Sequence, residues 1–321
     1  MSMDSTGTRI RPELVAATEL MRTENPERIE SALRLLQNTV YSFSMKVCGH
    51  REDAEDTMQY VLQQSLPYLA KIDNPQALSV WLYKVARNRC SVMRRKSKFA
   101  PEHTLALDEL MPNERDLAHL MQNPDHGPEA AVLRGERDEQ LREAVLRMPP
   151  KYRLILVLHD MEGLDTAEVA RITGLKEGTV RIRLHRARLF VRKELSQPAQ
   201  PVARTKRSRR AAAGRTSAPA AAGLVAAVPV AAVPRSKECQ EIFANLSEYL
   251  DRRTDDVTCA QLQQHIEDCE PCVAFIRDLK QTIQRCREFA VPCAPQTDTA
   301  LRQLLTQEYL RLLKKTAPDA C

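Results

Sequence analysis

The chain has 321 residues, of which 28% are charged, 4% are aromatic and nine are cysteines. This length allows two or three ordinary domains, and the shortage of aromatic residues argues against a large β-sandwich or barrel. No signal peptide is visible, and the most apolar run, 220–233, is shorter than the roughly 20 residues of a membrane helix. We therefore expect an all-α, cytoplasmic chain with no membrane segment, whose cysteines serve metal or thiol chemistry before structural disulfides.

Residues 26–98 are predicted to form a first helical domain. Pro26 precedes apolar residues at helical spacing, a second run begins near Asp53, and Asn74 followed by Pro75 is typical of a helix start. The apolar positions of the first run are Ile29, Leu33, Leu36, Val40 and Phe43. Cys48 and Cys90 fall within these helices and are expected to be small core residues.

The end of this domain, KVARNRCSVMRRKSK at 84–98, contains seven Lys or Arg residues and no acidic residue. On its own, such a run is as often a solvated helix face as a nucleic-acid-binding surface. Residues 99–134, which are interrupted by several prolines, are predicted to be a linker with at most a short helix.

Residues 135–196 are predicted to be helical and to contain a helix-turn-helix over 164–195. Asp165 with Glu168 resembles a capping box, Gly174 permits the tight turn, and a second helix begins near Glu177. One face of that second helix is expected to be buried, through Val180, Leu184, Ala187 and Val191. Its other faces present Arg181, Ile182, Arg183, His185, Arg186, Arg188 and Arg192. A helix of this kind suits a DNA major groove, whereas the structural alternative is a basic helix in a bundle.

Together these segments resemble the extracytoplasmic-function group of the sigma-70 family of RNA polymerase sigma factors. GHREDAEDTMQYVLQQ (49–64) is similar to region 2.2, and LSVWLYKVARNRCSVMRRK (78–96) to regions 2.3 and 2.4. Residues 141–188 resemble region 4 almost throughout. The resemblance implies a factor without catalysis of its own, whose partners are core RNA polymerase and promoter DNA.

The resemblance also implies a role for individual residues. Region 4 would read the −35 element through Arg181, Ile182, His185, Arg186 and Arg188. Region 2 would bind and open the −10 element, with Trp81 near the melted strand or in its supporting core, and with Arg87, Asn88, Arg94 and Arg95 near phosphates. Asp53, Glu55 and Asp56 would face polymerase.

Residues 197–236 are rich in Ala, Pro and Arg and contain seven basic residues and no acidic one. They lack the bulky apolar residues that a folded core needs, so they are predicted to be a disordered tether.

The segment 237–290 contains a spaced set of cysteine and histidine residues. Cys239, His265, Cys269 and Cys272 form C-x25-H-x3-C-x2-C, which matches one tetrahedral zinc ion in a closed site. The pattern resembles the zinc-binding anti-sigma domain. Cys259 is an alternative ligand or a resolving thiol, and the spacing does not decide the roles of Cys286, Cys293 and Cys321.

The zinc could be purely structural, or its thiolates could sense oxidants or metals. We hypothesise that this domain regulates the sigma domains in cis, by inhibition or by tuning of polymerase contact. Residues 291–321 include a predicted amphipathic helix, 296–316, which could clasp a sigma domain. The alternatives are a DNA-binding activator or repressor without a polymerase role, and a C-terminal module that docks another regulator. No phosphate loop, nucleophile motif or open metal site supports an enzyme.

Overall fold

In the computed structural model the described residues are 10–23, 25–69, 71–72, 74–94, 105–112, 114–122, 134–196, 246–247, 249–251, 263, 269–291 and 299–316. Within these ranges the chain forms helices and no strand, which confirms the predicted all-α class. None of the described helices combines the length and apolarity needed to cross a bilayer. The predicted tether 197–236 lies outside the described residues.

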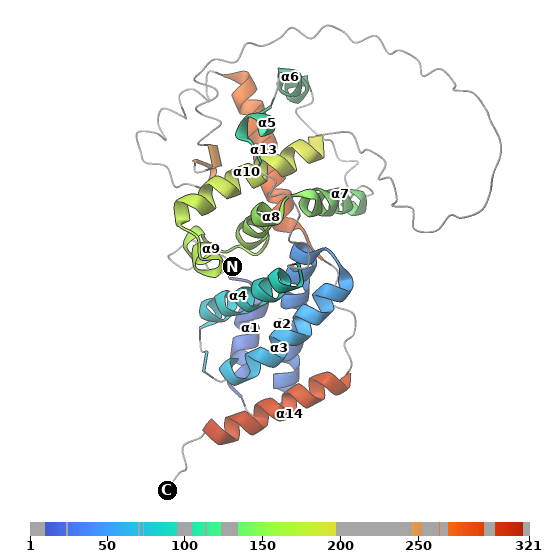
Figure 1. The fold of residues 1–321 in the computed structure, drawn as a ribbon, viewed down its shortest axis with the longest axis vertical. Helices are drawn as coiled ribbons and strands as arrows, with labels where there is room; N and C mark the ends of the chain where they lie inside the picture. Colours follow the sequence, from blue (N-terminus) through green and yellow to red (C-terminus); the bar gives the residue numbers. More distant parts are fainter. Residues whose placement is uncertain are drawn as a thin grey trace, which may run out of the picture.

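Four helices pack together as the N-terminal unit, with α2 in contact with the other three (Figure 1). They are α1 (Pro12–Met21), α2 (Pro26–Cys48), α3 (Arg51–Leu69) and α4 (Pro75–Arg94). The predicted helix starts are confirmed, because the side chains of Asn25 and Asn74 accept hydrogen bonds from backbone N–H groups of the first turns at 2.9 and 2.8 Å. Such caps satisfy donors that the start of a helix leaves without partners.

The core of the N-terminal unit follows the predicted pattern and extends beyond it. The five apolar positions predicted for α2 are each at most 1% exposed. Helix α1 precedes the predicted domain start at residue 26. It packs on α2 because Leu14, Ala17 and Met21 fall on one of its faces and are buried.

Cys48 and Cys90 are buried in this core, as predicted, but they also form a disulfide between α2 and α4. The expectation that cysteines of this chain avoid structural disulfides is therefore wrong for this pair. Packing of the two helices brings the Cα atoms to 6.3 Å, a separation that a disulfide spans.

The helix-turn-helix unit consists of residues 134–196. Its elements are α7 (Arg134–Arg147), α8 (Pro150–Leu156), the π-helical turn η2 (Val157–Met161), α9 (Thr166–Thr173) and α10 (Glu177–Ser196). The preceding linker contains α5 (Leu107–Leu110) and α6 (Glu114–Gln122), one helix more than predicted. The described part of the linker is more helical than expected because α5 packs on α10, and α6 packs on a helix near the C-terminus.

The C-terminal segment, whose described residues lie within 246–316, reaches both units. Helix α13 (Glu270–Glu288) contacts α6, α10 and η2, whereas α14 (Thr299–Thr316) lies across the far end of the N-terminal unit against α2 and α3 (Figure 1). On α14, Leu305 and Tyr309 are buried, and the Tyr309 hydroxyl donates to the carbonyl oxygen of Met21 at 3.2 Å.

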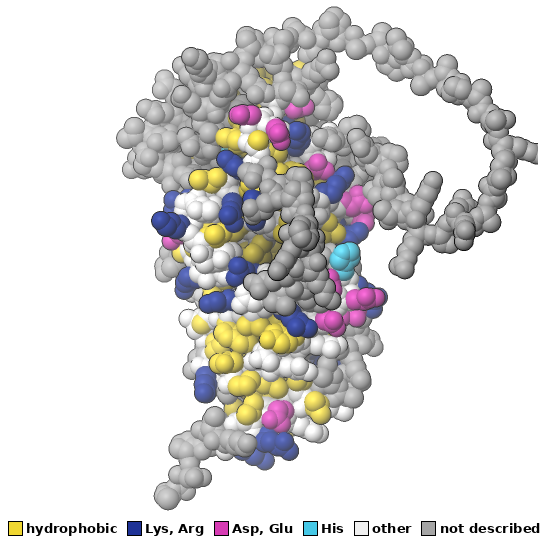
Figure 2. Space-filling view, in the orientation of Figure 1, with side chains coloured by type: hydrophobic (Ala, Val, Ile, Leu, Met, Phe, Trp, Pro, Cys, Tyr) yellow, Lys and Arg dark blue, Asp and Glu magenta, His cyan; other side chains and the backbone are white. Residues whose placement is uncertain are grey.

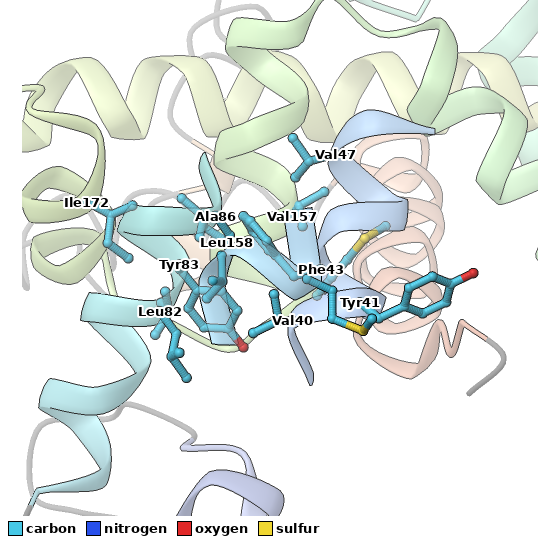
Figure 3. Packing of buried hydrophobic residues seen from close by; sticks show 14 of the residues in the cluster. Val40, Tyr41, Phe43, Val47, Leu82, Tyr83, Ala86, Val157, Leu158 and Ile172 are labelled. Atoms are coloured by element: carbon cyan, nitrogen blue, oxygen red, sulfur yellow. The ribbon is translucent and has the colours of Figure 1, made fainter. Parts of the chain in front are cut away.

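One hydrophobic core runs through the N-terminal and helix-turn-helix units. Figure 3 shows Val157 and Leu158 of η2 beside Phe43 and Tyr83 of the N-terminal unit. At Gly49 the backbone has a φ of +80°, and a Cβ there would lie 2.6 Å from the Leu146 side chain of α7. Glycine therefore permits both the end of α2 and the close approach of the two units.

Candidate nucleic-acid interface

The helix-turn-helix is built by local interactions that the sequence predicts. The Asp165 side chain accepts from the N–H of Glu168 at 2.7 Å, and the Glu168 carboxylate accepts from the N–H of Asp165 at 2.9 Å. This confirms the capping box at the start of α9. Gly174 ends α9 with a φ of +72°, in the left-handed region that favours glycine. These features fix the angle at which α10 leaves the turn.

The buried face of α10 is also confirmed. Val180, Leu184, Ala187 and Val191 are each at most 2% exposed and belong to the core shared by the two units. The remaining faces of α10 are therefore the ones available to other contacts.

The first half of α10 is open on those faces. Ile182 is 58% exposed, and Arg181 forms a solvent-exposed ion pair with Glu177 at 3.3 Å. Such an exposed pair contributes little and exchanges easily for a phosphate. Arg186, further along, is half-buried and donates to the carbonyl oxygen of Leu105 at 3.2 Å.

From His185 onward, the C-terminal segment covers part of α10. His185 Nδ1 lies 2.8 Å from the Ser247 hydroxyl, and burial, followed by the charges of Arg188 and Arg186, lowers the pKa of His185 to about 4. Two predicted DNA contacts, His185 and Arg188, are therefore buried in this conformation.

Arg188 is buried and belongs to an ion cluster with two carboxylates. Its guanidinium donates to both carboxylate oxygens of Asp160 at 2.7 and 2.8 Å, and to both oxygens of Asp251 at 2.8 and 2.9 Å. Burial raises the pKa of Asp160, but the charge of Arg188 more than offsets it and keeps that pKa below its usual range. One turn on, Arg192 pairs with Asp278 at 2.8 Å and stacks on the Phe275 ring at 4.5 Å.

A second candidate surface lies on α3 and α4. Trp81 is half-buried and its ring centroid is 5.2 Å from that of Tyr68, which is 49% exposed. Two turns along, the Arg89 guanidinium lies 4.9 Å from the Tyr60 ring. Figure 2 shows apolar side chains gathered over α3 and α4, with Lys and Arg side chains at the border.

Tyr60 and Tyr68 are not among the residues predicted to bind DNA. Their spacing of eight residues, or about two helical turns, could have indicated an aromatic stripe on one face of α3. Exposed aromatic rings beside cations are suited to unpaired bases, since every base offers a face for stacking.

The residues predicted to lie near phosphates are in the C-terminal half of α4 and beyond it. Arg87 donates to the Asn88 side chain at 3.1 Å and to the carbonyl oxygen of Thr173 in α9 at 3.5 Å. Arg94 ends α4, its side chain lying outside the described part, and Arg95 is outside the described residues.

The acidic residues predicted to face polymerase lie at the start of α3. Asp56 is exposed, whereas Asp53 and Glu55 are half-buried. Glu55 pairs with Arg51 at 2.7 Å. This end of α3 therefore presents negative charge to solvent.

The predicted zinc ligands are only partly described. Cys269 is the N-cap of α13 and half-buried, and Cys272 lies in the first turn and is fully buried. A helix start favours thiolates, so this pair fits half of a tetrahedral zinc site. Cys239 and His265 lie outside the described residues, within which no three or more potential ligands gather.

Two families of known proteins match the two units described above. The sigma-70 region 2 model matches residues 32–99, and the sigma-70 region 4 model matches residues 138–191. The ECF RNA polymerase sigma factor SigW of Bacillus subtilis is 29% identical over 50% of this chain and 85% of its own length. The chain belongs to the extracytoplasmic-function group of the sigma-70 family.

Other relatives of this sigma factor match a similar share of its chain. The RNA polymerase sigma factor YlaC of Bacillus subtilis is 26% identical over 53% of the chain and 94% of its own length. The ECF sigma factor SigE of Mycolicibacterium smegmatis is 26% identical over 55% of the chain and 65% of its own length. A family described as "Putative zinc-finger" matches residues 239–272. The sigma factor thus carries a zinc-finger-like region beyond its two sigma regions.

Proposed function

We propose that the chain binds core RNA polymerase in the cytoplasm and directs promoter-specific initiation, without catalysis of its own. The observation that carries the proposal is the presence of two separate surfaces suited to nucleic acid in one sigma-70 family chain. One is the open first half of α10, and the other is the aromatic and basic face of α3 and α4.

At the −35 element, α10 would enter the major groove with its N-terminal end first. Arg181 and Ile182 would reach base edges or the adjoining backbone, while Arg186 would contact phosphate. His185 and Arg188 would add to this contact only after the C-terminal segment leaves them, because both are buried against it.

At the −10 element, Trp81 and Tyr68 would stack on unpaired bases of the opened strand. Arg87, Asn88, Arg94 and Arg95 would hold the phosphates beside them. Asp53, Glu55 and Asp56 would meet polymerase at the start of α3, where negative charge faces solvent.

The C-terminal segment would inhibit the factor in cis. Asp251 and Asp278 are paired with Arg188 and Arg192, so the C-terminal segment covers the face of α10 that carries these two cations. One zinc ion held by Cys239, His265, Cys269 and Cys272 would stabilise the fold that carries these carboxylates. The thiol pair at the start of α13 supports that site. Whether the zinc is structural or senses oxidants is decided by the response of transcription to thiol oxidation.

The test is in vitro selection of promoters with core RNA polymerase, comparing the full chain with residues 1–196. Initiation by the shorter chain and weaker initiation by the full chain are expected. Binding of duplex DNA without any polymerase-dependent initiation would instead favour an activator or repressor. Equal initiation by both chains would exclude inhibition by the C-terminal segment.

A further inference from the structure

The two surfaces proposed to bind promoter DNA must stand far apart when they work. The −10 and −35 elements are separate stretches of the promoter, and each base pair between them adds about 3.4 Å of B-form DNA. A sigma factor that holds both elements therefore needs its N-terminal and helix-turn-helix units to be separated.

In this structure the same two units are packed against each other. Helix α4 lies on α9, where the Gln76 side chain donates to Glu168 at 2.8 Å. Val157, Leu158 and Ile172 of the helix-turn-helix unit belong to one core with Tyr83 and Leu82 of α4 (Figure 3). This closed arrangement cannot span a promoter.

The centre of the contact is the carboxylate of Glu162, directly after η2, which is fully buried. Oε1 accepts from Lys46 Nζ at 3.0 Å, and Oε2 accepts from the Tyr83 hydroxyl at 2.7 Å and lies 2.7 Å from Arg11 Nε. All three of these partners belong to the N-terminal unit. Burial raises the pKa of Glu162, but the charges of Lys46 and Arg11 outweigh it and keep that pKa below its ordinary value.

A buried charge is tolerated only while its partners remain in place. The Lys46 side chain is fully buried too, so the loss of Glu162 would leave an uncompensated cation between the units. If the units separate, both charges return to water. Removal of one charge of the cluster therefore destabilises the closed arrangement and leaves the open one unaffected.

We infer that the N-terminal unit carries a docking site for the helix-turn-helix unit of the same chain, with Glu162 seated among Arg11, Lys46 and Tyr83. The inference rests on the proposed function only for its consequence, that undocking must precede promoter binding. Every partner of Glu162 named here lies within residues 1–196. The C-terminal segment also reaches this site, since Lys46 Nζ lies 5.9 Å from the centre of the Phe289 ring.

The test is hydrogen–deuterium exchange of the full-length protein without polymerase. Glu162→Gln should speed exchange of residues 157–164 and 166–173 about tenfold or more, while the middle of α10 keeps its protection. Glu139→Gln is the matched control, because it removes the same charge from an exposed ion pair of the same unit and should leave exchange unchanged. Lys46→Met removes the partner of Glu162 in the N-terminal unit and should speed exchange of the same two segments.

Glu162→Gln or Lys46→Met proteins that keep native helix content and wild-type exchange at both segments would overturn the docking site. If Glu162→Gln does not fold, Lys46→Met and Tyr83→Phe decide by the same readout. Because exchange is measured without polymerase, failure of the docking site is distinguishable from failure of the proposed function. A variant that opens but never initiates transcription with core polymerase contradicts only the latter.

Discussion

Two ion clusters of the helix-turn-helix unit differ in where the partners of their central residues reside. Arg188 has one carboxylate partner, Asp160, within its own unit and a second, Asp251, in the C-terminal segment. The partners of Glu162 come from the N-terminal unit. Departure of the C-terminal segment therefore leaves Arg188 paired, whereas departure of the N-terminal unit leaves Glu162 to water.

This difference indicates two kinds of control. Contact with the C-terminal segment can be lost and regained at small cost to the helix-turn-helix unit, because Asp160 keeps Arg188 in place. Contact with the N-terminal unit is closer to all-or-none, because the Glu162 cluster is complete only when the units are packed together.

The largest expected effect comes from removing the internal partner of Arg188. Asp160→Asn should lower the free energy of unfolding of the helix-turn-helix unit by about 3–5 kcal/mol, because it weakens the pairing of a buried guanidinium. Asp251→Asn should lower the free energy of unfolding much less, since Asp251 is partly exposed and Asp160 still pairs with Arg188. Thermal denaturation of both variants measures the contrast, and equal losses would show that the two carboxylates are equivalent.

Removing the acidic contacts of the C-terminal segment should free α10. The double variant Asp251→Asn with Asp278→Asn should bind promoter DNA about tenfold more tightly than the full-length wild-type chain, as measured by fluorescence anisotropy. Asp138→Asn with Glu139→Gln removes two exposed charges from α7 and is the control for net charge. A gain of the same size in that control would attribute the effect to overall charge.

A smaller effect is expected from a single donor of the Glu162 cluster. Tyr83→Phe removes only the hydroxyl and keeps the buried ring, while Lys46 and Arg11 still neutralise the carboxylate. Exchange of residues 157–164 should speed up about fivefold, less than in Glu162→Gln. An effect as large as that of Glu162→Gln would mean that the hydroxyl, and not the charges, stabilises docking.

The smallest effect is a pH dependence of the contact between α10 and the C-terminal segment. The pKa of His185 is about 4 when buried, against an ordinary 6.5. Protonation of His185 therefore favours the state in which the C-terminal segment has left α10. The contact between α10 and the C-terminal segment should be strongest above about pH 6.5 and weaken as the pH falls toward 4, by about fourfold between pH 7.5 and 6. Trypsin sensitivity of the full chain at several pH values measures this pH dependence. The His185→Gln control should show no change of trypsin sensitivity with pH.

Sequence reasoning succeeded where short-range rules decide the structure. The capping box of Asp165 and Glu168, the turn at Gly174 and the buried stripe from Val180 to Val191 follow from spacing alone. Arg188 shows the limit, because helical spacing places it on an outer face and cannot indicate that Asp251, 63 residues later, covers that face.

Long-range pairing explains the other omissions. The partners of Glu162 lie 79 and 116 residues away at Tyr83 and Lys46, and no local pattern links them. The disulfide of Cys48 with Cys90 likewise depends on how α2 and α4 pack. The aromatic pair of Tyr68 and Trp81 could have been anticipated only by knowing that α3 and α4 lie side by side.

The most direct test of the central claim is run-off transcription with core RNA polymerase from a selected promoter, using full-length chains. We predict weak initiation by the wild type, stronger initiation by the Asp251→Asn and Asp278→Asn variant, and the strongest when Glu162→Gln is added. The Asp138→Asn and Glu139→Gln chain should match the wild type. If the folded combined variant initiates no better than the wild type, neither contact restrains the sigma factor, and this account of its closed state is wrong.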